Sequence, residues 1–396
     1  MPHSPLTAIV LAGGGARGAY EAGVLRFLYE TLPRRAGQAV HPRVVCGTSA
    51  GAVNGAVAVA AVTAPSWASE LSRMWRDMRI ADVYGMTACD LLRAPPLTLG
   101  MRLGGKPSLV DAGPLAELVR TRLPWDLVRR TIDTGAVDAF VVAATDVDNG
   151  RTVLFVDRNT GGAEAVSTHP EQIIVPTQMR PKHCLASAAM PFLFPPIEIA
   201  GRLLVDGGLR LNTPLSPALH LGADRLLVVG TQASPRESWG HLRAADLSLG
   251  HLVGKAMTAL LFDPIEQDLR RLELVNGLLD AGEEAFGAGF LDRLNPVACA
   301  RRKAPFRRVD SVLVRPSEDL GAIAGAAWRS GRIQASPATR LLLSAVAAAE
   351  RPEEADLLSF LLFDQAFTAE VEDLGHRDAE AQEGAIARLF GLGSQN

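Results

Sequence analysis

The sequence predicts an α/β fold, a three-layer α/β/α sandwich around a mainly parallel sheet, followed by a helical C-terminal extension. Short runs of β-branched and aliphatic residues, bounded by turn residues, recur through the first 320 positions. Several of these runs are apolar at every position, which is typical of strands that are covered on both faces. Helical patterns lie between the runs, and a strand followed by a helix is the order found in βαβ units.

The expected elements follow one another in a simple order. Seven runs are predicted to be strands: Thr7–Leu11, Arg43–Cys46, Phe140–Thr145, Thr152–Val156, Leu203–Val205, Arg225–Gly230 and Ser311–Arg315. Four stretches have helical patterns: Ala19–Leu32, Ala50–Val62, Ile323–Glu350 and Glu353–Leu374. After Pro316 the strand pattern stops. We therefore expect an α/β domain over 1–320 and a helical extension over 321–396.

The composition excludes several classes of protein. The chain has 396 residues, of which 48% are hydrophobic and 21% charged, so it can build a globular core. Lys+Arg 40 against Asp+Glu 43 leave a formal net charge of -3, and no basic field is present to hold a nucleic acid. The four cysteines are widely separated, without a Cys-x-x-Cys pair or a His/Cys cluster at metal-ligand spacing. We expect no nucleic-acid partner and no structural metal.

The sequence contains no clear export or membrane signal. Met1–Pro5 lacks a basic start, and no apolar core of a signal peptide follows it. Val44–Ser69 has no charged residue and is long enough to cross a bilayer. It consists mostly of Ala, Gly and Val, however, where a spanning helix would carry Leu, Ile and Phe. We expect this stretch to be buried in a cytoplasmic protein, whose membrane contact would be peripheral.

A glycine cluster follows the first predicted strand. Gly13, Gly15 and Gly18 fit the dinucleotide pattern G-x-G-x-x-G. That function also needs an acidic residue about 20 positions later, and no residue between Glu30 and Glu70 is acidic. A phosphate loop is disfavoured because Gly-Lys-Ser/Thr is absent. Successive glycines at the start of a helix instead expose backbone N–H groups, which can hold an anion such as the oxyanion of an acyl transfer.

A serine lies in a sharp turn after the second predicted strand. The sequence Gly47-Thr48-Ser49-Ala50-Gly51 is G-x-S-x-G between a strand and a helix, the context that a nucleophile elbow requires. Small neighbours let the turn close and let a substrate carbonyl approach Ser49. The alternative is that Ser49 caps the N-terminus of a buried helix. Two glycine motifs at strand-to-helix junctions favour the nucleophile.

A serine needs a base in order to attack at neutral pH. None of the eight histidines lies at the C-terminal end of a convincing strand. Asp206 does, and it is followed by Gly207 and Gly208. Active sites of open α/β sheets form at the carboxyl ends of strands, so Ser49 and Asp206 could share one rim. The alternative for Asp206 is a turn residue before two glycines.

Together these motifs resemble the patatin-like phospholipase family, lipid acyl hydrolases with a Ser/Asp dyad. Four stretches carry the resemblance: the glycine loop Gly13–Gly18 with its arginine, the elbow Gly47–Gly51, the block Leu185–Pro196 and the motif Asp206-Gly207-Gly208. They occur in the family's order over Thr7–Gly230, with fainter similarity up to Pro316 and in Leu361–Gly375. The chain departs from many members at Ala12, where those members have aspartate.

The resemblance implies a role for each of these residues. Ser49 would be the nucleophile and Asp206 its base and orienter. The oxyanion hole would be formed by the N–H groups of Gly13, Gly14 and Gly15. Arg17 would support the loop or bind a substrate phosphate. The glycines that support the motifs are Gly18, Gly47, Gly51, Gly207 and Gly208. The cycle would pass through an acyl-enzyme on a phospholipid, a lysophospholipid or another acyl ester, without metal or cofactor.

Two other functions stay open. A Ser-Asp-His hydrolase acting on esters, including non-lipid esters, would use His183 or His220 as its base, and alanine at the correct position would abolish activity. A lipid-binding or nucleotide-binding module without catalysis would keep the same loops for packing. No motif indicates the head group, the acyl-chain length or the oligomeric state.

Weaker signals lie outside these motifs. Leu91–Pro107 is rich in proline and glycine and is long enough to be a lid or an access loop. Arg301–Arg308 is the one dense basic run, and its pattern favours a solvated loop over a membrane contact. Apolar helical stripes in Leu252–Leu279 and Leu357–Val371 are expected to pack on the core.

Overall fold

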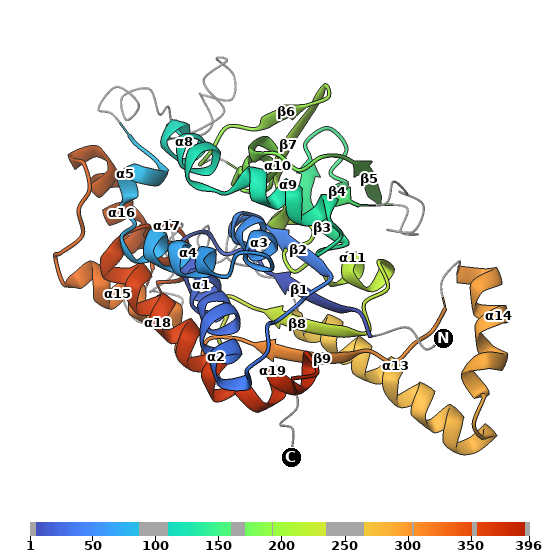
Figure 1. Ribbon diagram of the computed structural model, residues 1–396. Coiled ribbons are helices and arrows are strands. Elements are labelled where there is room, and N and C mark those ends of the chain that lie inside the picture. The colour runs from blue at the N-terminus through green and yellow to red at the C-terminus, as the bar shows by residue number, and fades with distance from the viewer. Residues whose placement is uncertain are drawn as a thin grey trace, which may run out of the picture.

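The nine strands found among the described residues form one mixed sheet with helices on both faces (Figure 1). The computed structural model describes residues 5–86, 110–159, 171–191, 193–234, 265–302, 305–350 and 355–392. The strands are β1 (Thr7–Leu11), β2 (Val44–Thr48), β3 (Ala139–Asp146), β4 (Thr152–Arg158), β5 (Gln172–Pro176), β6 (Ile197–Ile199), β7 (Arg202–Asp206), β8 (Arg225–Val229) and β9 (Asp310–Val314). Their order is β5-β4-β3-β2-β1-β8-β9, while β7 pairs with β3 and β6 pairs with β7.

Parallel pairing dominates the part of the sheet that carries the predicted site. β1 is parallel to β2 and β8, β2 is parallel to β3, and β8 is parallel to β9. Antiparallel pairing is confined to β4 with β3, β7 with β3 and β6 with β7 among the described strands. The expected α/β fold class is confirmed, and all seven expected strands are present. Two further strands were not expected from the sequence: β6, which has three residues, and the half-buried strand β5.

Alternate residues of the central strands contribute to two separate cores. Ile9 and Leu11 of β1 belong to the larger core, while Ala8 and Val10 belong to the core on the opposite face. The helices on the larger core include α1 (Gly18–Arg26), α3 (Ala50–Ala61), α4 (Ser66–Arg76), α9 (Trp125–Asp133) and α10 (Pro181–Ser187). The opposite face is covered by α11 (Leu215–His220) and α13 (Ile265–Phe286). This layering is the sandwich that the apolar strands predict.

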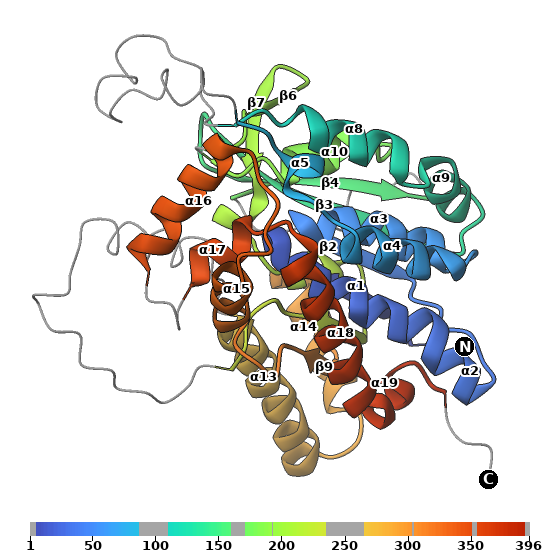
Figure 2. The same ribbon diagram turned by 90° about the vertical axis from the view of Figure 1, so that its left-hand side faces the viewer.

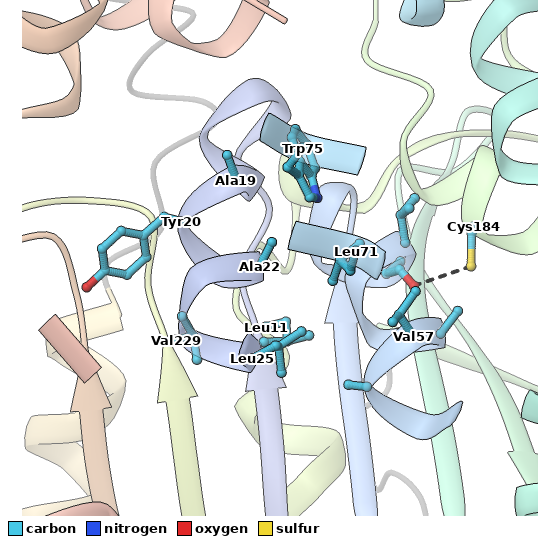
Figure 3. Close-up of a cluster of buried hydrophobic side chains, with 14 of the residues drawn as sticks. Leu11, Ala19, Tyr20, Ala22, Leu25, Val57, Leu71, Trp75, Cys184 and Val229 are labelled. Carbon is cyan, nitrogen blue, oxygen red and sulfur yellow. Dashed lines mark hydrogen bonds between the residues drawn. The ribbon is translucent and has the colours of Figure 1, made fainter. Parts of the chain in front are cut away.

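Small side chains let α1 and α3 lie close to the strands. Figure 3 shows Ala22 and Leu25 of α1 near Leu11 of β1, with α4 and its Trp75 alongside. Beyond α1 the helix continues through a π-helical segment, Phe27–Thr31, into α2 (Leu32–Ala36). The predicted helix Ala19–Leu32 is therefore real but mixed in its hydrogen-bond pattern.

The uncharged stretch Val44–Ser69 consists of β2, α3 and the first residues of α4. Every residue of α3 is buried, as expected for a helix inside a globular domain. A side chain at Gly55 would meet the ring of Phe140 at 3.0 Å, so the missing side chain lets α3 approach β3. None of the helices in the described part of the chain is long and apolar enough to span a bilayer.

The chain after β9 is helical and packs on α1 (Figure 2). The remaining helices of the described residues are α5 (Ile80–Val83), α8 (Gly113–Arg122), α14 (Phe290–Arg302), α15 (Leu320–Arg329), α16 (Pro337–Ala349), α17 (Asp356–Leu361), α18 (Gln365–Ala381) and α19 (Glu383–Leu389). A side chain at Gly375 of α18 would lie 2.0 Å from the carbonyl oxygen of Tyr20, so the two helix backbones nearly touch. We keep the division at residue 320 as a proposal.

Ion pairs fix α18 in this position. Glu372 is fully buried and binds the guanidinium groups of Arg26 and Arg76 at 2.7 and 2.9 Å. The Ser72 hydroxyl also donates to Glu372, at 2.7 Å. A buried carboxylate with three donors is compensated, whereas removing one of its partners would leave a costly charge. The C-terminal helices are therefore bound tightly to the α/β part.

Candidate active site

Ser49 occupies a strained turn between β2 and α3. Its φ and ψ angles are 55° and -122°, a backbone conformation that residues with a side chain rarely adopt. A side chain at Gly47 would meet the carbonyl oxygen of Gly51 at 2.2 Å, and one at Gly51 would meet that of Leu11 at 2.6 Å. Both glycines of the motif are therefore required by close backbone approach. The geometry is that of a nucleophile elbow.

The Ser49 hydroxyl is directed at Asp206 and not at the start of α3. Its Oγ donates to Oδ2 of Asp206 at 2.7 Å, and it makes no hydrogen bond that caps α3. Ser49 is 5% exposed and Asp206 2%, so the pair is largely removed from bulk water. The structure thus brings together the two residues that the motifs singled out, and the helix-cap interpretation of Ser49 does not hold.

Asp206 reaches Ser49 by a different route from the one expected. β7 is antiparallel to β3, so its direction is opposite to that of the parallel strands that form the rim. The β6–β7 hairpin instead enters from beyond that rim, and β7 pairs only with the last three residues of β3, with Asp206 opposite Ala144. Ser49 and Asp206 do meet at one rim of the sheet, as expected, but β7 reaches that rim from the opposite direction to the parallel strands.

The surroundings of Asp206 make it a better base than an ordinary carboxylate. Burial raises the pKa of Asp206 to about 6, against the opposing effect of hydrogen bonds from Ser49 and from the N–H of Gly208. The Gly208 N–H donates to Oδ1 at 2.7 Å, so Asp206 also fulfils the alternative role of a turn residue. A carboxylate with a pKa near 6 is ionised at neutral pH and still accepts a proton readily.

Ser187 on α10 binds the backbone of the turn that carries Ser49. It was not among the residues predicted from the sequence. The backbone N–H of Ser49 donates to Oγ of Ser187 at 2.8 Å, and that hydroxyl donates to the carbonyl oxygen of Ala143 at 2.6 Å. Ser187 is fully buried. It lies in the block that resembles the family motif before Asp206, which was the available signal. This contact fixes the turn against β3.

The glycine loop lies beside Ser49 and is fixed at its first residue. The Gly13 N–H donates to the carbonyl oxygen of Asn212 at 3.0 Å, and the Gly13 carbonyl accepts from the hydroxyl of Thr231 at 2.8 Å. A side chain at Gly13 would lie 3.2 Å from Cβ of Ser49. The Gly13 N–H is therefore already hydrogen-bonded within the protein and is not free to bind an oxyanion. Asn212 and Thr231, which belong to no recognised motif, were missed.

Two N–H groups of this loop stay available. Within the described part of the chain, the N–H groups of Gly14 and Gly15 donate to no protein acceptor. Gly15 has φ 55° and lines the same pocket as Ser49. Of the three N–H donors expected for the oxyanion hole, the N–H groups of Gly14 and Gly15 are thus free to bind an oxyanion.

Arg17 does not face the site. Its side chain is 3% exposed and binds Asp356 of α17 at 2.9 Å. The expected role of supporting the loop agrees with this contact. The alternative role of binding a substrate phosphate does not, because the guanidinium is enclosed by protein groups.

The pocket in front of Ser49 is apolar. It encloses about 660 Å³ of space, counting its open mouth. Its wall comes from the glycine loop, α3, α4, α8, the segment after α10 and the segment after α17. The lining residues are Gly15, Ser49, Ala50, Val53, Leu71, Met74, Trp75, Met78, Val83, Leu115, Leu118, Ala188, Met190, Leu193, Phe194 and Phe363. Such a wall suits a hydrocarbon chain.

No histidine in the described part of the chain takes part in the Ser49–Asp206 pair. Nδ1 of His183 accepts from the N–H of Arg180, and Nδ1 of His220 lies 2.7 Å from the carbonyl oxygen of Ser216. Burial, with the nearby charges of Lys182 and Arg180, lowers the pKa of His183 to about 4. Of the histidines that the structure describes, none is hydrogen-bonded to Ser49 or Asp206. The Ser-Asp-His alternative has no support at His183 or His220.

Other stretches singled out by the sequence lie elsewhere. Within the basic run Arg301–Arg308, Arg307 donates to the Ala223 carbonyl oxygen, and Arg308 binds Asp280 and Glu283. Leu91–Pro107 lies outside the described residues, as do the first residues of Leu252–Leu279. Searching the described residues finds no cluster of His, Cys, Asp and Glu that could hold a metal ion.

A buried glutamate lies next to the pocket wall. Glu21 of α1 is fully buried and accepts from the Asn54 amide at 2.8 Å. Asn54 in turn accepts from the indole N–H of Trp75, which lines the pocket. Burial raises the pKa of Glu21 well above its ordinary value, against hydrogen bonds from Asn54 and the Ala12 backbone. Burial therefore favours the neutral form of the Glu21 carboxyl group in the folded protein.

We expect Glu21→Gln to stabilise the protein at pH 8 and to have little effect at pH 4. The unfolded chain releases this proton near pH 4.5, whereas the folded chain keeps it, so stability is greatest below pH 4.5 and falls as the pH rises. Glutamine keeps the shape and removes the titration. Thermal unfolding of both proteins across this pH range measures the effect. The exposed Glu284→Gln on α13 is the matched control, and a pH-independent gain for Glu21→Gln would contradict the prediction.

Comparison with known proteins relates the chain to a known family. The family model described as patatin-like phospholipase matches residues 9–219. Uncharacterized NTE family proteins of Mycobacterium bovis and Mycobacterium tuberculosis are 28% identical over 241 residues, which is 59% of this chain and 51% of each relative. The chain thus spans about half the length of the curated relatives it matches.

The matches to solved structures have lower sequence identity. The match to human GIVD cytosolic phospholipase A2 has a TM-score of 0.42 and 13% identity, and it covers 98% of this chain and 60% of that chain. VipD from Legionella pneumophila gives a TM-score of 0.35 and 13% identity, and it covers 98% of this chain and 75% of that chain.

Proposed function

Because the chain belongs to the patatin-like phospholipase family, we propose that it is a serine hydrolase of lipid acyl esters, with Ser49 as nucleophile and Asp206 as base. The observation that carries the proposal is the 2.7 Å hydrogen bond from Ser49 Oγ to Asp206 Oδ2, beside an apolar pocket that Ser49 lines. A strained serine next to a buried carboxylate is the arrangement of an activated nucleophile.

The proposed reaction begins with the attack of Ser49. As its Oγ bonds to the ester carbonyl carbon, its proton passes to Asp206, and the carbonyl oxygen becomes an oxyanion. The free N–H groups of Gly14 and Gly15 would stabilise this charge. Collapse of the tetrahedral intermediate breaks the bond to the alcohol, which takes the proton from Asp206. The acyl group remains on Ser49.

Water then releases the acyl group. Asp206 takes a proton from the water molecule as its oxygen attacks the acyl carbonyl carbon, and the second oxyanion faces the same two N–H groups. Collapse returns the proton to Ser49 Oγ and releases the fatty acid. Each step uses one carboxylate and no second base. Because a carboxylate is a weak base toward serine, we expect modest turnover.

The pocket supports a substrate with an acyl chain. Leu71 and Met74 of α4, together with Phe194 after α10, line the pocket beside Ser49 with hydrocarbon side chains. Burying a methylene group in such a wall contributes about 0.8 kcal/mol. Phospholipids, lysophospholipids and other long-chain esters all fit this description. We further propose that the protein meets its substrate by peripheral contact with a membrane or micelle, at local patches, because its formal net charge is only -3.

A long-chain alkyl fluorophosphonate tests the proposal. We expect the folded protein to be labelled with one equivalent of probe, and peptide mapping to place the adduct on Ser49. The heat-denatured protein is the control, since an unfolded serine has no activating base. Failure of the folded protein to react in the presence of micelles would favour the non-catalytic binding module instead.

A further inference from the structure

The short helix α17 and the residues after it contact the candidate active site, although they lie outside the matched residues 9–219. One contact reaches the glycine loop through Arg17, and another reaches the pocket through Phe363. In Figure 2, α17 lies among the C-terminal helices at the end of the molecule that also carries α16. The C-terminal segment therefore takes part in the site and does more than cover the core.

The Arg17 guanidinium is bound to α17 at several points. Its Nε donates to Oγ of Ser359 at 2.6 Å, and its Nη2 donates to Oδ1 of Asp356 at 2.9 Å. The ring of Phe360 stacks under the guanidinium, with 4.5 Å from Cζ to the ring centre. Nη1 donates to the Thr231 carbonyl oxygen at 3.4 Å. Because the Arg17 guanidinium is surrounded by protein groups, loss of any one of these charge-assisted hydrogen bonds would cost free energy of folding.

The backbones of the glycine loop and α17 also touch. A side chain at Gly15 would lie 2.4 Å from the carbonyl oxygen of Phe360. Gly15 has φ 55°, a conformation that any other residue would adopt at a cost. The position and the backbone conformation of this proposed oxyanion donor therefore depend on where α17 lies.

α17 is itself held rigidly. The carboxylate of Glu350 accepts from the N–H groups of Leu357 and Leu358 at 2.7 and 3.1 Å. The Tyr84 hydroxyl donates to the carbonyl oxygen of Leu361 at 2.8 Å. A helix anchored at both ends can act as a fixed support for a glycine-rich loop.

We propose that Asp356 and Ser359 of α17 are positioning residues, which act through Arg17 to hold the N–H groups of Gly14 and Gly15 in register with Ser49. The inference rests on the proposed function. Asn212 and Thr231 hold the loop at Gly13, and the Arg17 contacts hold it at its other end. A glycine-rich loop fixed at both ends presents its donors without reorganisation, which is the condition for effective oxyanion stabilisation.

The kinetic pattern distinguishes this role from a general effect on stability. We expect Asp356→Asn and Ser359→Ala each to lower kcat by about 10-fold or more while KM changes little, since a misplaced oxyanion donor acts on the transition state. The loss should be the same for p-nitrophenyl butyrate and p-nitrophenyl dodecanoate. Phe363 lies just after α17 and lines the pocket. Phe363→Ala should therefore weaken catalysis only for the long-chain ester.

Asp378→Asn is the matched control. Asp378 of α18 accepts from the Tyr20 hydroxyl at 2.9 Å, so it also joins a C-terminal helix to α1, but it does not contact the glycine loop. We expect this variant to lower the melting temperature and leave kcat unchanged. A conservative Arg17→Lys, which keeps the charge but loses the planar fork, should reproduce the loss of kcat if Asp356→Asn fails to fold.

The outcomes separate the two proposals. If the wild type is active and labelled on Ser49 but Asp356→Asn, Ser359→Ala and Arg17→Lys all keep kcat, the positioning role is overturned and the proposed function stands. An equal loss of kcat in Asp378→Asn would also overturn it. If the wild type neither hydrolyses esters nor reacts with the fluorophosphonate, the proposed function fails first.

Discussion

Replacing Ser49 by alanine is expected to lower kcat for ester hydrolysis on the order of 10⁴-fold or more, because the attacking oxygen is removed. The same variant should no longer react with the fluorophosphonate. The hydroxyl binds only Asp206 in the described structure, so its loss leaves the packing of β2 and α3 intact. Retention of measurable turnover in Ser49→Ala, beyond the background of the buffer, would remove the assignment of the nucleophile.

Ser49→Gly provides the matched comparison for stability. Both variants lack the hydroxyl, and they differ only in a methyl group on a residue with φ 55°. Glycine adopts positive φ freely, whereas a strained residue with a side chain costs about 1 kcal/mol or more. We therefore expect Ser49→Gly to unfold at a higher denaturant concentration than Ser49→Ala. Equal unfolding midpoints would show that the backbone at residue 49 is not strained. Both variants should be inactive.

The second large effect is expected at Asp206. Asp206→Asn keeps the size of the side chain and an oxygen that can accept from Ser49, but it cannot take up the proton. We expect kcat to fall by about 10³-fold or more, in line with the loss of an essential general base. For the wild type, kcat/KM should rise with pH through a pKa of about 6 and level off above neutral pH. A profile without this acidic limb would contradict the assignment of the base.

The same substitution should increase stability at neutral pH. The pKa of Asp206 is about 6 when folded against an ordinary value of 3.8, so the unfolded chain releases the proton first. Stability from this group is therefore fully present below pH 3.8 and is lost as the pH rises through about 6. Asparagine removes this loss of stability, which lowers the free energy of unfolding by up to about 3 kcal/mol at pH 8. The gain should vanish near pH 4.

Asp146 is the control for this effect. It is also buried and ends β3, but it binds Arg202 at 2.7 Å. Burial tends to raise its pKa, and the hydrogen bonds from Arg202 and from the N–H of Asp148 outweigh it and hold the pKa below the ordinary value. Asp146→Asn should therefore destabilise the protein at neutral pH, opposite in sign to Asp206→Asn. Chemical denaturation at pH 4 and pH 8 measures both variants.

Local backbone chemistry explains what could be predicted from the sequence. The close approach of Gly47 and Gly51 to neighbouring carbonyl oxygens leaves a readable pattern around Ser49. Asp206 could be selected because it ends an apolar run before two glycines. The direction of its strand could not, because three residues of pairing between β7 and β3 leave no periodic signal.

Long-range contacts explain what was missed. Arg17 and Asp356 are 339 positions apart, and nothing near either residue indicates the other. Thr231 and Ser187 act through single hydroxyl groups on backbone atoms of distant turns. Such contacts depend on how the elements are assembled, and one sequence contains no record of that assembly.

The contact between α1 and α18 also determines when the fold is completed during synthesis. α1 leaves the ribosome early, but the surface formed by Tyr20 and Gly23 is covered only after Glu372–Asp378 has been made. α17, which holds Arg17, emerges shortly before α18. Closing contacts over such a sequence distance slows folding, and the exposed face of α1 is at risk of aggregation until then. A nascent chain that already contains Ser49 and Asp206 thus lacks these contacts until α17 and α18 have been translated.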